Sequence, residues 1–230
     1  MDRRNFVGLT LGCGTLALVR PAAAASTPES WDGLVRVKSK TFQLVYLQPG
    51  ADFRGYTKVM IDPTEVAFRK NWAKDYNSGI RGVGGRVSDA DVEKATQQGA
   101  AAATDIFSSA FTKAGYSVVK DAGPDVLRVR TLLLNIHVRA PDVPQAGRTR
   151  SYASEAGEAS LVVEVRDSES GAMMGRAVDR RLAGENSILS RNQVSNRSDF
   201  RNLVQSWANE SARGLGELKS LSPVAAGGSK

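Results

Sequence analysis

SDADVEKATQQGAAAATDIFSSAFTKAG, residues 88–115, is the stretch that decides the fold class. Ser88 followed by acids is typical of a helix start, because a hydroxyl caps the first N–H groups and acids suit the positive end of the helix dipole. Apolar side chains then recur every three to four residues as far as Phe111, and Gly115 is placed to end the helix. Most side chains on this stripe are small, so we expect the helix to lie close against a sheet.

Strand-like segments lie on both sides of this helix. Residues 34–48 and 56–68 come before it and are rich in β-branched and aromatic side chains. Pro63 inside the second segment predicts a bulge or an edge position. After the helix, the pattern predicts a strand at 126–139, a hairpin of 160–166 with 174–182, and a second helix that opens at Ser198. This order predicts an α+β fold: a mostly antiparallel sheet with two main helices packed on one face.

The first 25 residues have the organisation of a secretory signal peptide. A short basic region precedes the apolar run Phe6–Val19, and the small residues 22–26 follow as a cleavage site. The run is shorter than the about 20 residues that a membrane span needs. Arg3-Arg4-Asn5-Phe6-Val7 resembles the twin-arginine consensus, and Arg20 after a weakly apolar core also suits that route. We therefore expect export to the periplasm with removal of residues 1–25.

Cys13 is the only cysteine, and it has some resemblance to a lipoprotein acylation site. However, only Phe6–Gly12 would remain as the apolar region before it, and the apolar run continues past it. The sequence therefore favours soluble periplasmic release over an outer-membrane lipoprotein, with membrane contact only if Cys13 is acylated. Removal of the signal peptide would leave no cysteine for a disulfide or a metal.

The rest of the chain is predicted to be one domain. Residues 26–33 form a polar leader, 34–219 a single α+β domain, and 220–230 a disordered tail. The formal net charge of +7 is basic. It suits anionic partners such as phospholipid headgroups or cell-wall polymers, although ordinary solubility also accounts for it. Because the chain is expected to leave the cytoplasm, we expect no nucleic-acid partner.

His137 is the only histidine and lies on the predicted strand 126–139. No serine or cysteine motif stands in a recognisable relation to it, and one histidine with carboxylates has no metal-ligand spacing. We expect a packed or solvent-facing histidine. Strand alternation puts it on the face of Thr131 and Leu133, and puts on the other face a continuous apolar row of Leu132, Leu134, Ile136 and Val138.

Three acids near the second strand are the candidates for catalysis. Asp52, Asp62 and Glu65 lie close in sequence, and a pair of carboxylates can run hydrolysis. Basic residues nearby, such as Arg54, make surface ion pairs the simpler interpretation. We therefore predict no catalytic residue, no metal and no cofactor, and keep a hydrolase that uses these acids as an alternative.

The predicted loop 71–87 contains the candidate binding site, Arg81-Gly82-Val83-Gly84-Gly85-Arg86. Glycines let backbone N–H groups approach a phosphate, and the helix start that follows adds a positive end. The segment lacks the lysine and hydroxyl of a nucleotide loop and the spacing of a dinucleotide fingerprint. Two interpretations remain, a flexible loop or a small-anion site made by Arg81, Gly82, Gly84, Gly85 and Arg86.

Several short motifs carry a family resemblance: Tyr46-Leu-Gln-Pro-Gly-Ala-Asp-Phe53, Val59-Met-Ile-Asp-Pro63, Val66-Ala-Phe68 and Trp72. They resemble the bacterial exported-protein family called domain of unknown function 3313, from about Gly33 to Leu218. Many members look like lipoproteins, and the family brings no known catalytic residue.

The order of elements in this family is similar to that of periplasmic modules such as the curli secretion lipoprotein, the N-terminal domain of the translocation protein TolB and peptidoglycan-synthase activators. Those are binding and assembly modules. The resemblance therefore implies a non-enzymatic module whose partner is an envelope protein or a cell-wall component. This implication is an analogy of fold, and function does not follow from fold alone.

Overall fold

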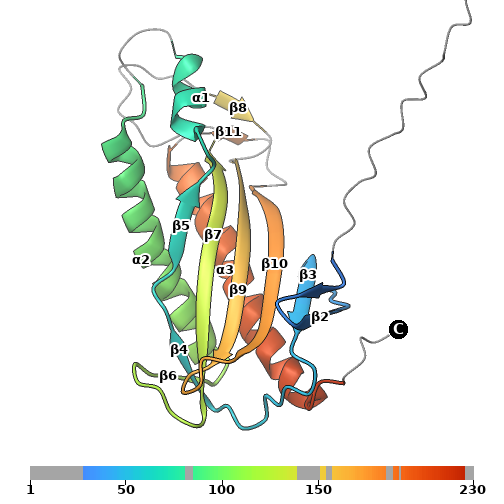
Figure 1. Ribbon diagram of the computed structural model, residues 1–230. Helices are drawn as coiled ribbons and strands as arrows, with labels where there is room; N and C mark the ends of the chain where they lie inside the picture. The colour runs from blue at the N-terminus through green and yellow to red at the C-terminus, as the bar shows by residue number, and fades with distance from the viewer. Residues whose placement is uncertain are drawn as a thin grey trace, which may run out of the picture.

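The computed structural model describes residues 28–80, 85–138, 151–153, 157–184, 189–191 and 193–225. Figure 1 shows a long, curved sheet accompanied by two long helices. In chain order the elements are β1 (Ser30–Trp31), β2 (Leu34–Val37), β3 (Leu44–Leu47), β4 (Lys58–Ile61), β5 (Glu65–Phe68), α1 (Trp72–Ser78), α2 (Asp89–Lys113), β6 (Ser117–Val118), β7 (Val126–Val138), β8 (Ser151–Ala153), β9 (Gly157–Asp167), β10 (Met173–Ala183), β11 (Leu189–Arg191) and α3 (Gln193–Leu221).

The main sheet has nine strands in the order β1-β2-β3-β10-β9-β7-β4-β6, with β5 also paired to β7. The strands from β1 to β7 along this order pair antiparallel, whereas β4 and β5 run parallel to β7, and β6 parallel to β4. Helix α2 provides the long crossover that parallel neighbours require. The predicted α+β class is confirmed, and the sheet is mixed. A separate two-stranded sheet joins β8 and β11.

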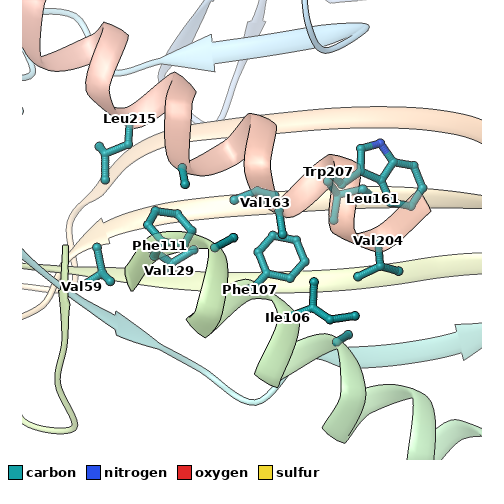
Figure 2. Close-up of a cluster of buried hydrophobic side chains, with 14 of the residues drawn as sticks. Val59, Ile106, Phe107, Phe111, Val129, Leu161, Val163, Val204, Trp207 and Leu215 are labelled. Carbon is teal, nitrogen blue, oxygen red and sulfur yellow. The ribbon is translucent and has the colours of Figure 1, made fainter. Parts of the chain in front are cut away.

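Large side chains from both long helices fill the core. Helices α2 and α3 contact each other, and each also contacts strands of the sheet. Phe107 and Phe111 of α2 and Trp207 of α3 belong to one buried cluster with Val129 and Leu161 of the strands, as Figure 2 shows, and each is at most 1% exposed. Full burial of such a side chain stabilises the fold by about 1.5–3 kcal/mol. None of the helices in the described ranges has the length and hydropathy of a membrane span.

The predicted apolar face of β7 is wrong for its first half. Thr131 and Leu133 are buried, whereas Leu132 and Leu134 are only half-buried. The reason is a bulge at Asn135, where φ is 53° and the register with β9 shifts between Leu134 and His137. One extra residue reverses the alternation, so that core positions are odd-numbered before the bulge and even-numbered after it.

Other boundaries follow tertiary contacts that periodicity does not report. The segment 34–48 is a hairpin of two strands, not one strand. The predicted loop 71–87 contains the short helix α1, held by Trp72, which is 4% exposed and stacks on Phe68. Helix α3 begins at Gln193, five positions before the predicted start at Ser198 (198 − 193 = 5).

The packed domain extends past the predicted ends of 34 and 219. Residues 30–31 form β1 of the sheet, and the Tyr46 hydroxyl donates to the carbonyl of Pro28. At the other end, Val224 pairs through its backbone with Gly50 and Ala51, with N···O distances of 2.9 and 2.8 Å. Residues 1–27 and 226–230 lie outside the described residues.

Candidate functional site

A pocket of about 700 Å³ lies between the β2–β3 hairpin, the C-terminal half of α3 and strands β9 and β10. We call it the α3 pocket. Its volume falls in the range of about 300–1,000 Å³ that is typical of small-molecule sites. Apolar side chains from four separate parts of the chain line its wall, among them Phe42, Val45, Phe111, Val163, Leu215 and Leu218.

Two glycines help to shape this pocket. A Cβ at Gly175 would lie 2.9 Å from Leu47 Cδ2 and 3.2 Å from Val165 Cγ2, so a side chain there would force Leu47 and Val165 to shift. Gly214 is different, since a Cβ there would meet no atom within 4 Å. Glycine inside a helix costs about 1 kcal/mol relative to alanine. At Gly214 the missing side chain leaves open space in the pocket wall.

The charged side chains among the exposed lining residues of the α3 pocket are mostly basic. Lys38, Lys40 and Arg213 line it and are exposed, together with one acid, Glu217. Arg213 Nε lies 3.8 Å from Glu217 Oε1, within one helix. Within the described part of the chain, neither lysine forms an ion pair with another residue. The mouth of an apolar cavity is therefore positively charged.

A buried carboxylate fixes the loop 38–43 that forms one wall of the pocket. Asp179 on β10 is 3% exposed. It accepts hydrogen bonds from the Trp207 indole (Nε1···Oδ2 2.8 Å) and from the backbone N–H of Gln43 (3.2 Å). Arg181 also forms an ion pair with Asp179, with Nε 2.6 Å from Oδ2. One carboxylate thus joins the loop, the sheet and α3.

Arg181 extends the same network to α3 and back to the loop. It donates to Glu210 Oε2 at 2.6 Å and to the carbonyl of Thr41 at 3.1 Å. The hydrogen bond to Glu210, with the nearby charge of Asp179, raises the pKa of Arg181 above its usual value. Because two carboxylates hold this guanidinium, the loop wall is fixed at both Thr41 and Gln43.

The structure brings together two of the three candidate acids. Asp62 and Glu65 both line a second pocket of about 500 Å³, in which arginines from β7 also lie. Arg128 Nε is 2.9 Å from Asp62, and Arg130 Nη2 is 2.6 Å from Glu65. Asp52 does not line this pocket; it binds Arg54, whose hydrogen bonds lower the pKa of Asp52 to about 2. In all three cases a guanidinium group holds the acid in an ion pair.

The glycine loop lies only partly within the described residues, because residues 81–84 fall outside them. Gly85 is buried with φ 82°, and Arg86 is exposed. The helix start behind it has the predicted cap, since Ser88 Oγ accepts the N–H of Asp91 at 3.2 Å and Asp91 Oδ2 accepts the N–H of Ser88 at 2.9 Å. The chain's own groups therefore occupy part of this helix terminus, and the small-anion site stays a prediction.

Within the described ranges, the remaining candidate is His137. His137 is half-buried and lies opposite Glu158 in the β7–β9 register. Among the described residues, no group of three or more histidines, cysteines and acids could hold a metal ion. Cys13 lies outside the described residues.

Sequence reasoning missed the α3 pocket entirely. Its walls come from residues 37–47, strands β9 and β10, and the end of α3, which are far apart in sequence. The available signals were Lys38 and Lys40 in a turn and two glycines, Gly214 and Gly216, inside an amphipathic helix. Neither signal points to a cavity without the tertiary fold.

Comparison with known proteins gives distant structural likenesses and one family. A search of curated proteins gives no match. The PelC dodecamer of Paraburkholderia phytofirmans is 10% identical, with 73% of this chain and 94% of that chain covered and a TM-score of 0.36. A Xanthomonas campestris protein of the DUF330 family is 10% identical, with 81% and 94% covered and a TM-score of 0.40. A neuraminyllactose-binding hemagglutinin homolog of Helicobacter pylori is 13% identical, with 76% and 92% covered and a TM-score of 0.33.

Likenesses this distant carry no inference about function. The family comparison is more extensive, because the model of DUF3313, a protein family of unknown function, matches residues 24–211. The chain belongs to the DUF3313 family.

Proposed function

We propose that this protein is a non-enzymatic binding module of the cell envelope, exported to the periplasm with removal of residues 1–25. In this proposal, both main helices pack on one face of the sheet, and the partner is an envelope protein or cell-wall component. The observation that carries the binding function is the α3 pocket, an apolar cavity of about 700 Å³ that opens at a basic mouth.

The construction of the pocket supports binding. Buried ion pairs and hydrogen bonds fix its loop wall, so that little ordering is needed when a ligand enters. Apolar surface that stays open to solvent is costly in a folded protein, and such surface commonly marks a binding site.

The acids considered for hydrolysis have a simpler role. Asp62 and Glu65 each bind an arginine of β7, so that ion pairs between neighbouring strands account for both. No observation in the described residues favours hydrolysis over binding, and the α3 pocket contains neither acid.

The test compares two matched substitutions in α3, Gly214→Leu and Gly216→Leu. Only Gly214 lines the pocket, and a Cβ at either position meets no atom within 4 Å. Both changes replace a helical glycine and are expected to stabilise α3 by up to about 1 kcal/mol. Proteins and glycans crosslinked in intact cells are then recovered with each full-length variant. We expect one envelope component with wild type and Gly216→Leu and its loss with Gly214→Leu; the same recovery from all three would contradict the proposal.

Export is tested separately. Replacement of Arg3-Arg4 by Lys-Lys should block the twin-arginine route, because that route reads the arginine pair. Fractionation of cells then measures the share of the chain in the periplasm. Undiminished export of the Lys-Lys variant excludes the route, and a chain that stays in the cytoplasm in both forms excludes export itself.

A further inference from the structure

We propose that the α3 pocket binds a single aliphatic chain that ends in an anionic group, the chemistry shared by fatty acids and single-chain phospholipids; this inference goes beyond the proposed function, because such a ligand is a lipid and neither a protein nor a cell-wall polymer. Three features carry it, namely the apolar wall, the internally satisfied polar groups of the lining and the lysines at the mouth.

The two serines of the lining and its arginine on the sheet have partners within the protein. Ser39 Oγ accepts the N–H groups of Thr41 and Phe42, both at 3.1 Å. Ser211 Oγ donates to the carbonyl of Trp207 at 2.8 Å. Arg176, the one lining arginine on the sheet, is held by Glu164 at 2.8 Å and by an acid of the β1–β2 turn.

A ligand inside the pocket therefore meets mainly carbon. A sugar or peptide backbone there would leave polar groups unpaired, each at a cost of about 1–3 kcal/mol. An aliphatic chain has no such groups, and it gains about 0.8 kcal/mol for each buried methylene. The pocket interior consequently favours a hydrocarbon chain over a sugar or a peptide backbone.

The mouth selects an anionic head. Lys38 and Lys40 come from the hairpin turn, and Arg213 comes from α3, so that two separate elements contribute cations to the lining. Glu217 is the one exposed acid of the lining, and Arg213 is its partner. The two lysines, which pair with no acid in the described residues, remain for a ligand carboxylate or phosphate. Exposed pairs of this kind each strengthen binding by about two- to fivefold.

Equilibrium dialysis of the full-length protein with octanoate, decanoate and dodecanoate tests the apolar part. We expect each step of two methylenes to strengthen binding by up to about 15-fold, until the pocket is full. Gly214→Leu should weaken dodecanoate binding by about fourfold for each ligand methylene that the new side chain displaces from the pocket, and Gly216→Leu should leave it unchanged. An affinity independent of chain length, or equal in the two glycine variants, overturns the inference.

Dodecanol tests the anionic part, since it keeps the chain and lacks the charge. We expect dodecanoate to bind about fivefold more tightly than dodecanol. The double variant Lys38→Ala, Lys40→Ala should remove that preference. The control variant Lys74→Ala, Lys94→Ala removes the same charge outside the pocket and should retain it. Equal affinity of wild type for the two probes contradicts an anionic ligand.

Lauroyl-lysophosphatidylglycerol distinguishes the two sources, because it has the same chain and a phosphate head. Tighter binding than dodecanoate assigns a phospholipid, and weaker binding assigns a free fatty acid; both results support the shared chemistry. If no amphiphile binds while Gly214→Leu still abolishes the crosslinked envelope partner, this inference fails and the proposed binding function stands.

Discussion

Substitution of Asp179 by alanine should be the most damaging single change near the α3 pocket. The carboxylate is 3% exposed and accepts from Trp207, Gln43 and Arg181. Loss of one partner from a buried ion pair typically costs about 3–5 kcal/mol. In the variant, Arg181 would still have its ion pair with Glu210, at 2.6 Å. We therefore expect the loss of stability to lie near the lower limit of this range, about 3 kcal/mol. The loop wall also loses its anchor at Gln43, so dodecanoate binding should weaken as well.

Urea denaturation followed by circular dichroism measures the free energy of unfolding of Asp179→Ala. A double-mutant cycle with Trp207→Phe isolates the hydrogen bond between the indole and the carboxylate, with an expected coupling of about 1.5–3 kcal/mol. Asp105→Ala is the control, since Asp105 is exposed on α2 and should change stability by less than about 0.5 kcal/mol. A loss below about 1 kcal/mol for Asp179→Ala would refute the role given to this carboxylate.

Three further changes test the fold outside the α3 pocket. Ser88→Ala removes the N-cap of α2 and should lower the free energy of unfolding by about 1 kcal/mol in urea; no change means that the cap is not needed. Burial and the hydrogen bond to Asp167 raise the pKa of Tyr56 to about 12, above its ordinary value of 10.0. The protonated tyrosine therefore stabilises the folded state below pH 10, and this contribution to the free energy of unfolding is lost as the pH rises from about 10 to 12. Tyr56→Phe should reduce the loss of stability in that window without abolishing it, because burial also raises the pKa of Tyr116. A loss of stability equal to that of wild type would show that Tyr56 makes no contribution. Gly157→Ala puts a Cβ against the carbonyl of His137 and should destabilise by about 2 kcal/mol; a melting temperature equal to that of wild type counts against the close approach of β7 and β9.

Local patterns in the sequence predict those elements whose signals lie within the element. Helix α2 begins at the predicted cap, Ser88, and ends before the predicted stop, Gly115. The β9–β10 hairpin contains both predicted segments, 160–166 and 174–182. Capping and turn chemistry act between residues a few positions apart, which explains these successes.

Features that depend on distant contacts were not predictable. The bulge at Asn135 reverses which side chains of β7 are buried, and no pattern in 126–139 marks it. Helix α1 is too short to show a period and depends on the burial of Trp72. Of the candidate site residues, Asp62 and Glu65 do lie together, because β4 and β5 both pair with β7.

The central claim is that the α3 pocket holds a ligand in the cell. A photoreactive phenylalanine analogue in place of Phe42, which lines the pocket, tests it most directly. The control has the same analogue in place of Asp105, an exposed residue of α2 that does not line the pocket. Irradiation of intact cells and mass spectrometry of the full chain should find a covalent adduct of one defined mass at position 42 and none at position 105. Equal labelling at both positions, or no adduct at position 42, would contradict the account.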